Sequence, residues 1–363
     1  MSSWPEWLPL SERLRPLSPY GAPQLPADAV LNTNESPFSL SPALSSAIAN
    51  RIEGVAKNLN RYPDRDATVL RSELAAFINS LSGTALSTEN VWAANGSNEI
   101  IQSIFLAFGD GGAVGFTPSY SMHPLIARVT NVAWVDGPRR EDFSLDLQMA
   151  KAEIAKNSPS LTFITTPNNP TGSSVTIAEI EELAQVVTGL LVVDEAYAEF
   201  SDETSAATLI KKYPQVVVIR TMSKAFSFAG VRLGYLLADK AVIDALFLVR
   251  LPYHLSAITQ AAAEVALEYR EELLGNVATL IHNRESVKSQ LEQLGLEVIP
   301  SKANFLLFSG FDIPAPVLWK SLLDAGVLIR DVGLSGYLRV TIGNEAENKL
   351  FIDALTSIIK TSR

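Results

Sequence analysis

Short, almost wholly apolar segments recur along the first two thirds of the chain, and stretches with helical spacing separate them. The clearest of these segments are NVWAA (90–94), LTFITT (161–166), GLLVVDEA (189–196) and QVVVIRT (215–221). Strands that are buried on both faces have this composition, and the intervals between them are long enough for crossover helices. The pattern therefore predicts an α/β fold with a mostly parallel, doubly wound central sheet between about residues 40 and 250.

The two ends of the chain have different patterns. The first 35 residues are rich in proline and lack periodicity, which is typical of an extended arm. A long helical stretch (251–295) is followed by strand-like and helical segments up to GYLRVTIG (336–343), which predicts a second, smaller α+β domain. We expect an arm at 1–38, a large domain at 39–255, and a small C-terminal domain at 256–363 that packs with part of the arm.

Composition and charge narrow the classes of function. The 363 residues carry 29 Lys and Arg against 39 Asp and Glu, a net charge of −10, which argues against a nucleic-acid or membrane-surface binder. An anionic ligand must then be held by local arginines. With no cysteine and three scattered histidines, we expect no disulfide, no thiolate nucleophile and no metal site. No basic segment precedes an apolar stretch at the start, and no apolar run reaches membrane-spanning length, so a soluble cytoplasmic protein is expected.

Polar residues follow three of the predicted buried strands. They lie in PNNPTG (167–172), DEAY (194–197) and TMSK (221–224). Because ligands bind beyond the carboxyl ends of parallel strands, we expect these strand ends to form one site. The side chains that would meet there are Asn169, Asp194, Tyr197 and Lys224. Taken singly, the lysine could be a solvated charge, the aspartate a helix cap and PNNPTG a turn. The coincidence of three such strand ends favours a site.

A further segment, NGSNEIIQSIFLAF (95–108), adds an anion-binding element. Its apolar residues have helical spacing, Gly96 allows a tight turn, and Ser97 is expected to cap the helix, whose free amides bind phosphate. An ordinary capped helix would explain the segment equally well. Arg232 follows Lys224 by eight residues in a run of small residues. The glycines of GDGGAVG (109–115) do not fit a dinucleotide fingerprint, and neither G-x-S-x-G nor a P-loop is present.

Together these groups suit a phosphorylated cofactor with an aldehyde. A lysine captures the aldehyde, an aspartate pairs with a pyridinium nitrogen, and helix-end amides with an arginine hold the phosphate. Pyridoxal 5′-phosphate is the cofactor with these three features.

The chain resembles the class I/II group of fold-type I pyridoxal-phosphate aminotransferases in SKAFSFAGVRLGY (223–235), PNNPTG and DEAYAEF (194–200). Within that group it resembles the histidinol-phosphate aminotransferases of the actinobacterial type. The segments that carry this closer resemblance are SPYGAPQLP (18–26), LNTNESP (31–37), NRYPDRDA (60–67), WAANGSNEI (92–100), PSYSMHP (118–124), LVRLPYHLS (248–256) and LIRDVG (328–333). The likeness runs from the arm to LRVTIG, over nearly the whole chain.

The resemblance implies a role for each site residue. Lys224 would bind the cofactor covalently, Asp194 would face the pyridine nitrogen, and Tyr120 would stack on the ring. Asn169 and Tyr197 would hydrogen-bond the ring hydroxyl. The residues implied around the phosphate are Ser97, Asn98, Thr221, Ser223 and Arg232, with Tyr62 from the partner subunit of a homodimer with shared sites. The substrate pocket implied is Tyr20, Asn98, Tyr253, Arg330 and Arg339.

The substrates implied by the resemblance are histidinol phosphate and the pair 2-oxoglutarate and glutamate, in histidine biosynthesis. Two arginines suit both a phosphate ester and a dicarboxylate, since guanidinium pairs with either oxyanion. Surface salt bridges would also explain Arg330 and Arg339, and packing would explain Asn98 and Tyr253. An aromatic amino-acid aminotransferase is the nearest alternative, and the arm with Tyr20 favours the phosphate substrate. A related phosphothreonine decarboxylase is less well supported, because it would have to act on a different bond at Cα. A non-catalytic pyridoxal-phosphate regulator would need a DNA-binding extension, which this acidic chain lacks.

Overall fold

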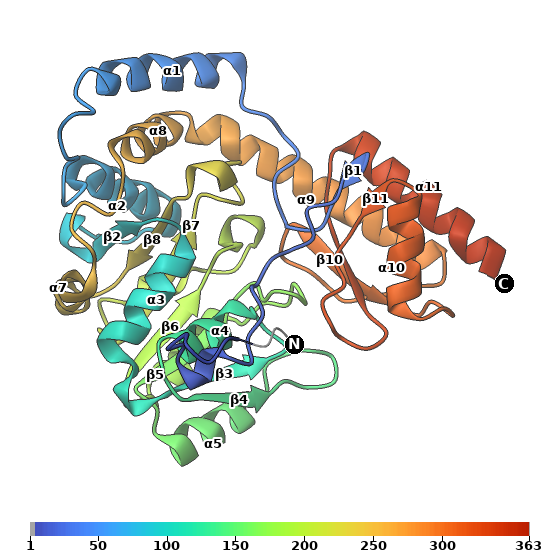
Figure 1. Cartoon of the computed structure of the whole chain (residues 1–363), viewed down its shortest axis with the longest axis horizontal. Coiled ribbons are helices and arrows are strands. Elements are labelled where there is room, and N and C mark those ends of the chain that lie inside the picture. Colours follow the sequence, from blue (N-terminus) through green and yellow to red (C-terminus); the bar gives the residue numbers. More distant parts are fainter. Residues whose placement is uncertain (1–3, 363) are drawn as a thin grey trace.

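A computed structural model describes residues 4–362, so residues 1–3 of the expected arm and residue 363 of the expected small domain lie outside the described residues. The large sheet of the described chain has seven strands in the order β2-β8-β7-β6-β5-β3-β4. In sequence order they are β2 (Val91–Ala94), β3 (Ala113–Thr117), β4 (Trp134–Pro138), β5 (Leu161–Thr165), β6 (Leu190–Asp194), β7 (Val216–Thr221) and β8 (Gly234–Leu237). Figure 1 shows helices on both sides of this sheet, as the sequence predicts.

Alternate residues of the central strands are buried on opposite faces of the large sheet. Val216 and Val218 of β7 pack in one apolar core, whereas Val217 and Ile219 pack in the other. This two-sided burial explains why the strands are almost wholly apolar. The helices over the first face are α2 (Thr68–Ser82), α5 (Leu147–Asn157), α6 (Ile177–Ala184) and α8 (Ala257–Glu268), and those over the second are α3 (Ser97–Phe108), α4 (Met122–Val129) and α7 (Lys240–Val249).

A small sheet lies in the C-terminal part of the chain. Its antiparallel strands are β12 (Leu338–Thr341), β10 (Phe305–Ser309) and β9 (Glu297–Val298), and its helices are α9 (Arg270–Gln293), α10 (Ala315–Asp324) and α11 (Glu345–Ser362). Strand β1 (Ala29–Val30) pairs in parallel with β11 (Val327–Leu328), so the end of the arm joins this part of the molecule. Helix α1 (Pro42–Ala56) packs on α8, away from the small sheet (Figure 1). The domain boundaries given above stay a prediction.

Three local features differ from the simplest interpretation of the sequence. Strand β8 runs antiparallel to both of its neighbours, β2 and β7. The helical stretch 251–295 is divided into α8 and α9. Ser97 does not cap α3: Gly96 occupies the cap position with φ 80°, and Ser97 is the first helical residue.

The described chain also contains short 3₁₀ helices. They are η1 (Glu12–Leu14), η2 (Thr88–Asn90), η3 (Gly109–Gly111), η4 (Ala198–Phe200), η5 (Ala206–Leu209) and η6 (Ala229–Val231).

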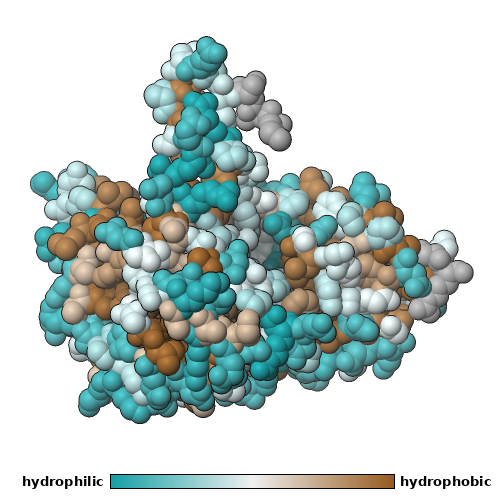
Figure 2. Space-filling view, turned by 90° about the horizontal axis from the view of Figure 1, so that it is seen from below, coloured by the Kyte–Doolittle hydropathy of each residue, from teal (hydrophilic) through white to brown (hydrophobic). Residues whose placement is uncertain are grey.

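The surface is mainly hydrophilic on the face shown in Figure 2, where apolar residues form separate patches. Within residues 4–362, none of the helices has the length and apolar character needed to cross a membrane. The cytoplasmic location expected from the sequence stays a prediction.

Candidate active site

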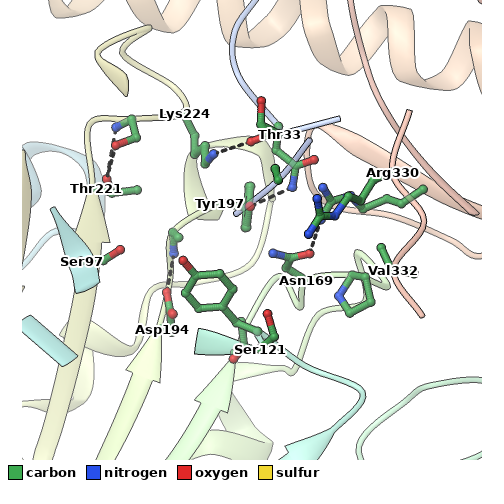
Figure 3. Close-up of a pocket in the computed structure, with 18 of the residues that line it drawn as sticks. Thr33, Ser97, Ser121, Asn169, Asp194, Tyr197, Thr221, Lys224, Arg330 and Val332 are labelled. Carbon is green, nitrogen blue, oxygen red and sulfur yellow. Dashed lines mark hydrogen bonds between the residues drawn. The ribbon is translucent and has the colours of Figure 1, made fainter. Parts of the chain in front are cut away.

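A cavity of about 310 Å³ lies at the carboxyl ends of β5, β6 and β7, where residues of the arm and of the small sheet close it. Figure 3 shows side chains from all these parts pointing toward one another. The residues predicted from the sequence that line it are Tyr20, Ser97, Asn98, Tyr120, Asn169, Asp194, Tyr197, Thr221, Ser223, Lys224, Arg232, Arg330 and Arg339. The fold thus brings the three predicted strand ends to one place, and the individual roles of these residues stay predictions.

Lys224 lies in the loop that follows β7. Its side chain retains some exposure to the cavity, but its amino group lies deep in the protein and donates to the carbonyl oxygen of Thr33 at 3.0 Å (Figure 3). Burial lowers the pKa of Lys224 to about 8, and the nearby guanidinium groups of Arg339 and Arg232 contribute in the same direction. The neutral amine, which is the nucleophilic form, is therefore far more populated near neutral pH than in an ordinary lysine.

Asp194, the last residue of β6, is almost fully buried and is held from two directions. The Nε2 atom of His123 lies 3.1 Å from Oδ2, and the backbone amide of Ala196 donates to Oδ1 at 3.2 Å. An ionised carboxylate only accepts hydrogen bonds, so His123 carries its proton on Nε2 when Asp194 is charged. His123 is not among the site residues predicted from the sequence. The only available signal was its place in PSYSMHP, because α4 brings it to Asp194 from 71 residues away.

Two tyrosines in the cavity remain phenols at neutral pH. Burial raises the pKa of both Tyr120 and Tyr197. The Tyr120 hydroxyl donates to Oδ1 of Asn98 at 3.1 Å, and the Tyr197 hydroxyl accepts from Nδ2 of Asn34 at 2.9 Å. Asn34 is a further cavity residue that the sequence argument did not select.

One end of the cavity is built for an anion. The first turn of α3 presents its free amides there, and the Arg232 guanidinium lies so close to Gly96 that a Cβ on this glycine would be 2.6 Å from Nη2. Thr221 and Ser223 add hydroxyl groups, with Thr221 donating to Ser223 at 3.0 Å. Gly96 is therefore required both for its positive φ and for the close approach of Arg232.

Two further cations reach the cavity from the C-terminal part. Arg339 on β12 donates to Oδ1 of Asn169 at 2.5 Å and to the carbonyl oxygen of Asn32 at 2.8 Å, while its Nε has no hydrogen-bond partner among the described residues. Burial lowers the pKa of Arg339 to about 10. Arg330 pairs with Arg339 through both backbone hydrogen bonds, at 2.9 Å each. Within residues 4–362 no carboxylate forms a salt bridge with either arginine, which argues against the surface-salt-bridge explanation.

The comparison with known proteins agrees with this geometry. The family model described as aminotransferase class I and II matches residues 28–355. This chain belongs to that family. It is 54% identical over 357 residues to the histidinol-phosphate aminotransferase of Mycobacterium marinum, covering 98% of this chain and 93% of the relative. The enzyme of that name from Mycolicibacterium smegmatis is 53% identical over 351 residues, covering 96% and 92%.

Among solved structures, the aminotransferase chain resembles histidinol-phosphate aminotransferase from Sinorhizobium meliloti in complex with pyridoxal-5′-phosphate. The TM-score is 0.85 at 25% identity, and the match covers 100% of both chains. The resemblance and the fold-type I architecture predicted from the motifs are thereby confirmed.

Two predicted residues of this aminotransferase lie outside the cavity of their own chain. Tyr62 is 79% exposed, and its ring stacks on that of Tyr253, with centroids 4.4 Å apart and an interplanar angle of 17°. The expected role of Tyr62 in the partner's site stays a prediction. Tyr253 was expected in the substrate pocket and does not line it here, so its role also stays a prediction.

Proposed function

We propose that this aminotransferase transfers the amino group of L-histidinol phosphate to 2-oxoglutarate, with pyridoxal 5′-phosphate as its cofactor, in histidine biosynthesis. The observation that carries the proposal is one cavity that joins a lysine of lowered pKa, a buried aspartate and an anion pocket to two arginines that form no salt bridge with a carboxylate of residues 4–362. The high identity to mycobacterial histidinol-phosphate aminotransferases over nearly the full chain supports this substrate.

The residues present suit pyridoxal phosphate. The Lys224 amine is available to capture the aldehyde, the Asp194 carboxylate to pair with the ring nitrogen, and the α3 amides with Arg232 to hold the phosphate. Asn169 and Tyr197 would bind the ring hydroxyl, and Tyr120 would cover a ring face. When bound, the cofactor supplies an electron sink for the bond that is broken at the substrate Cα.

Lys224 would transfer the proton of the substrate Cα. Because its pKa is about 8, the amine is able to accept a proton at the substrate Cα near neutral pH and to release it again. With the cofactor bound, the Asp194 carboxylate, which His123 holds from the other side, would favour a proton on the ring nitrogen by stabilising the positive charge there. The remaining side chains orient the reacting groups.

Substrate anions would bind near the small sheet. Arg330 and Arg339 offer guanidinium groups that pair with the phosphate of histidinol phosphate or with a carboxylate of 2-oxoglutarate. The arm brings Tyr20 to the same cavity. One pocket would then accept both substrates in turn.

The active form would be a homodimer with shared sites. Three apolar side chains stay largely exposed in the single chain. Leu59 (53%) is close to Tyr62 in the sequence, and Leu248 (86%) and Leu251 (72%) are close to Tyr253, whose ring stacks on Tyr62. Exposed apolar surface of this kind favours burial against a second copy.

An absorbance titration of cofactor-loaded protein tests the function. L-histidinol phosphate and, separately, L-phenylalanine are added with no oxo acid present, and conversion of the cofactor to its amine form is followed. Conversion at a much lower concentration of histidinol phosphate is expected. A preference for phenylalanine would overturn the proposed substrate and favour an aromatic aminotransferase.

A further inference from the structure

Asn34 occupies an unusual place between the large and small sheets. It is 1% exposed, has a φ of 57°, and its amide is bonded at both ends. Nδ2 donates to the Tyr197 hydroxyl at 2.9 Å, and Oδ1 accepts from Oγ1 of Thr341 at 3.0 Å. Left-handed backbone disfavours most side chains and tolerates Asn, so this position combines a backbone constraint with a specific amide contact.

The hydrogen bonds around Asn34 define which way its amide faces. Thr341 Oγ1 accepts from the backbone amide of Asn34 at 3.0 Å and gives its own proton to Oδ1. If the amide were reversed, the proton of the buried Thr341 would have no acceptor among the described residues, and Thr341 does not line the cavity where a ligand or water could accept it. Asn304 also holds the segment, since its Nδ2 donates to the Asn34 carbonyl oxygen at 3.1 Å. The NH₂ group therefore faces Tyr197.

This orientation decides where the Tyr197 proton points. A phenol has one proton to donate, and its oxygen already accepts from Asn34. No acceptor for that proton is found among residues 4–362, and the ring of Tyr197 lines the cavity. Accepting a hydrogen bond also makes a hydroxyl a better donor, because the two bonds polarise each other.

We propose that Asn34 is a positioning residue that directs the Tyr197 hydroxyl proton into the cavity, toward the ring oxygen of the cofactor. This inference rests on the proposed function, because it assigns Tyr197 a donor role toward that cofactor. Asn34 acts through Tyr197 and through Thr341, which belongs to the small sheet.

Strand β12, which carries Thr341, also carries Arg339 of the proposed substrate pocket. Arg339 and Thr341 are two residues apart on β12, so both side chains lie on one face. Arg339 contacts the carbonyl oxygen of Asn32, and Thr341 contacts Asn34. The segment 32–34 consequently connects the small sheet to Tyr197 and, through Thr33, to Lys224.

The test uses the pH midpoint of the visible absorbance band of the cofactor-loaded protein. A hydrogen-bond donor stabilises the deprotonated chromophore, so its loss raises the midpoint. Asn34→Ala is expected to raise it by about one pH unit, and Tyr197→Phe by a similar amount. Asn34→Ala in the Tyr197→Phe background should add no further shift, because Asn34 acts through that hydroxyl.

Matched variants distinguish the loss of the Asn34–Tyr197 hydrogen bond from a general loosening of the segment 32–34. Thr341→Val should shift the midpoint in the same direction and Thr341→Ser should restore it. Asn304→Ala, which loosens the same segment without touching the amide-to-phenol bond, should leave it unchanged. A midpoint like that of the unaltered protein in both Asn34→Ala and Thr341→Val, or an equal shift in Asn304→Ala, would overturn the proposal. If Asn34→Ala does not fold, the two Thr341 variants decide.

A second measurement needs no cofactor. The ¹³Cζ resonance of Tyr197, identified by its loss in Tyr197→Phe, should move in cofactor-free Asn34→Ala and stay in place in Asn304→Ala. An unmoved resonance would contradict the contact itself. Failure to use histidinol phosphate by the unaltered protein, with these shifts intact, would overturn the proposed substrate and leave the positioning role standing.

Discussion

The amino group of Lys224 lies 3.0 Å from the carbonyl oxygen of Thr33, and this hydrogen bond joins the loop after β7 to the expected arm. The amino group is buried there near Arg339 and Arg232, and burial together with these two positive charges lowers the pKa of Lys224 to about 8. The nucleophile of the proposed reaction is thus prepared by the fold before any ligand binds.

The rate of cofactor capture by the cofactor-free protein should rise with pH and level off above about 8. The neutral amine is the attacking form, and the lowered pKa moves its population into this range from the ordinary value of 10.5. Stopped-flow absorbance with pyridoxal phosphate measures the rate, and Nα-acetyl-lysine under the same conditions corrects for titration of the cofactor. A protein profile that keeps rising to pH 10 would contradict the lowered pKa.

Lys224→Ala should abolish the visible band of the bound cofactor and reduce turnover by roughly a thousand-fold or more, because both the aldehyde-capturing amine and the proton carrier are lost. Circular dichroism should show an intact fold. Lys212→Ala, which removes an exposed lysine paired with Glu181, is the control and should leave both readings unchanged. Retained transamination in the Lys224 variant would refute the assignment.

Arg339→Lys should raise the KM for histidinol phosphate and for 2-oxoglutarate by about ten- to a hundred-fold. Lysine keeps the charge but loses the planar fork that pairs with an oxyanion. The dissociation constant of the cofactor should change by less than about three-fold, since the proposed phosphate site is formed by Arg232 and the first turn of α3. Unchanged KM values would remove Arg339 from the substrate pocket.

Mixing two inactive variants should restore activity if the sites are shared. In a hybrid of Lys224→Ala and Tyr62→Ala chains, one site combines an intact Lys224 with the partner's intact Tyr62. Random mixing should therefore recover about a quarter of the normal activity. Remixing after dissociation, followed by an activity assay, measures this. No recovery, in a mixture shown to contain hybrids, would place Tyr62 outside the partner's site.

Arg220→Met should destabilise the fold by about 3–5 kcal/mol. The buried Arg220 forms salt bridges with Glu195 at 2.8 Å and with Glu199 at 2.9 Å. Loss of the arginine would leave these two buried carboxylates without a cation. Burial raises the pKa of Glu199 even with the arginine present. Urea unfolding measures the change. Arg51→Met, which breaks more exposed pairs with Glu264 and Glu268, should cost less than about 1 kcal/mol. Equal losses in both variants would contradict the role of burial.

Much of the active-site cavity could be predicted from the sequence because its parts are local. An unbroken apolar run predicts a buried parallel strand, and the polar residues that follow the run must lie at the carboxyl end of that strand. Lys224, Asp194 and Asn169 were found in this way, and the cavity contains all three. The family motifs added Tyr20, Arg330 and Arg339, which the strand pattern alone did not place.

Only the tertiary structure revealed the side chains that hold the site residues from behind. His123 meets Asp194 across 71 residues, and Asn34 meets Tyr197 across 163 and Thr341 across 307. The antiparallel direction of β8 and the cap position of Gly96 were likewise settled by the fold. Hydrophobic periodicity reports burial along one segment, and it therefore determined the strands and their ends. Which buried polar groups satisfy one another depends on how distant segments pack, and only the folded chain decides that.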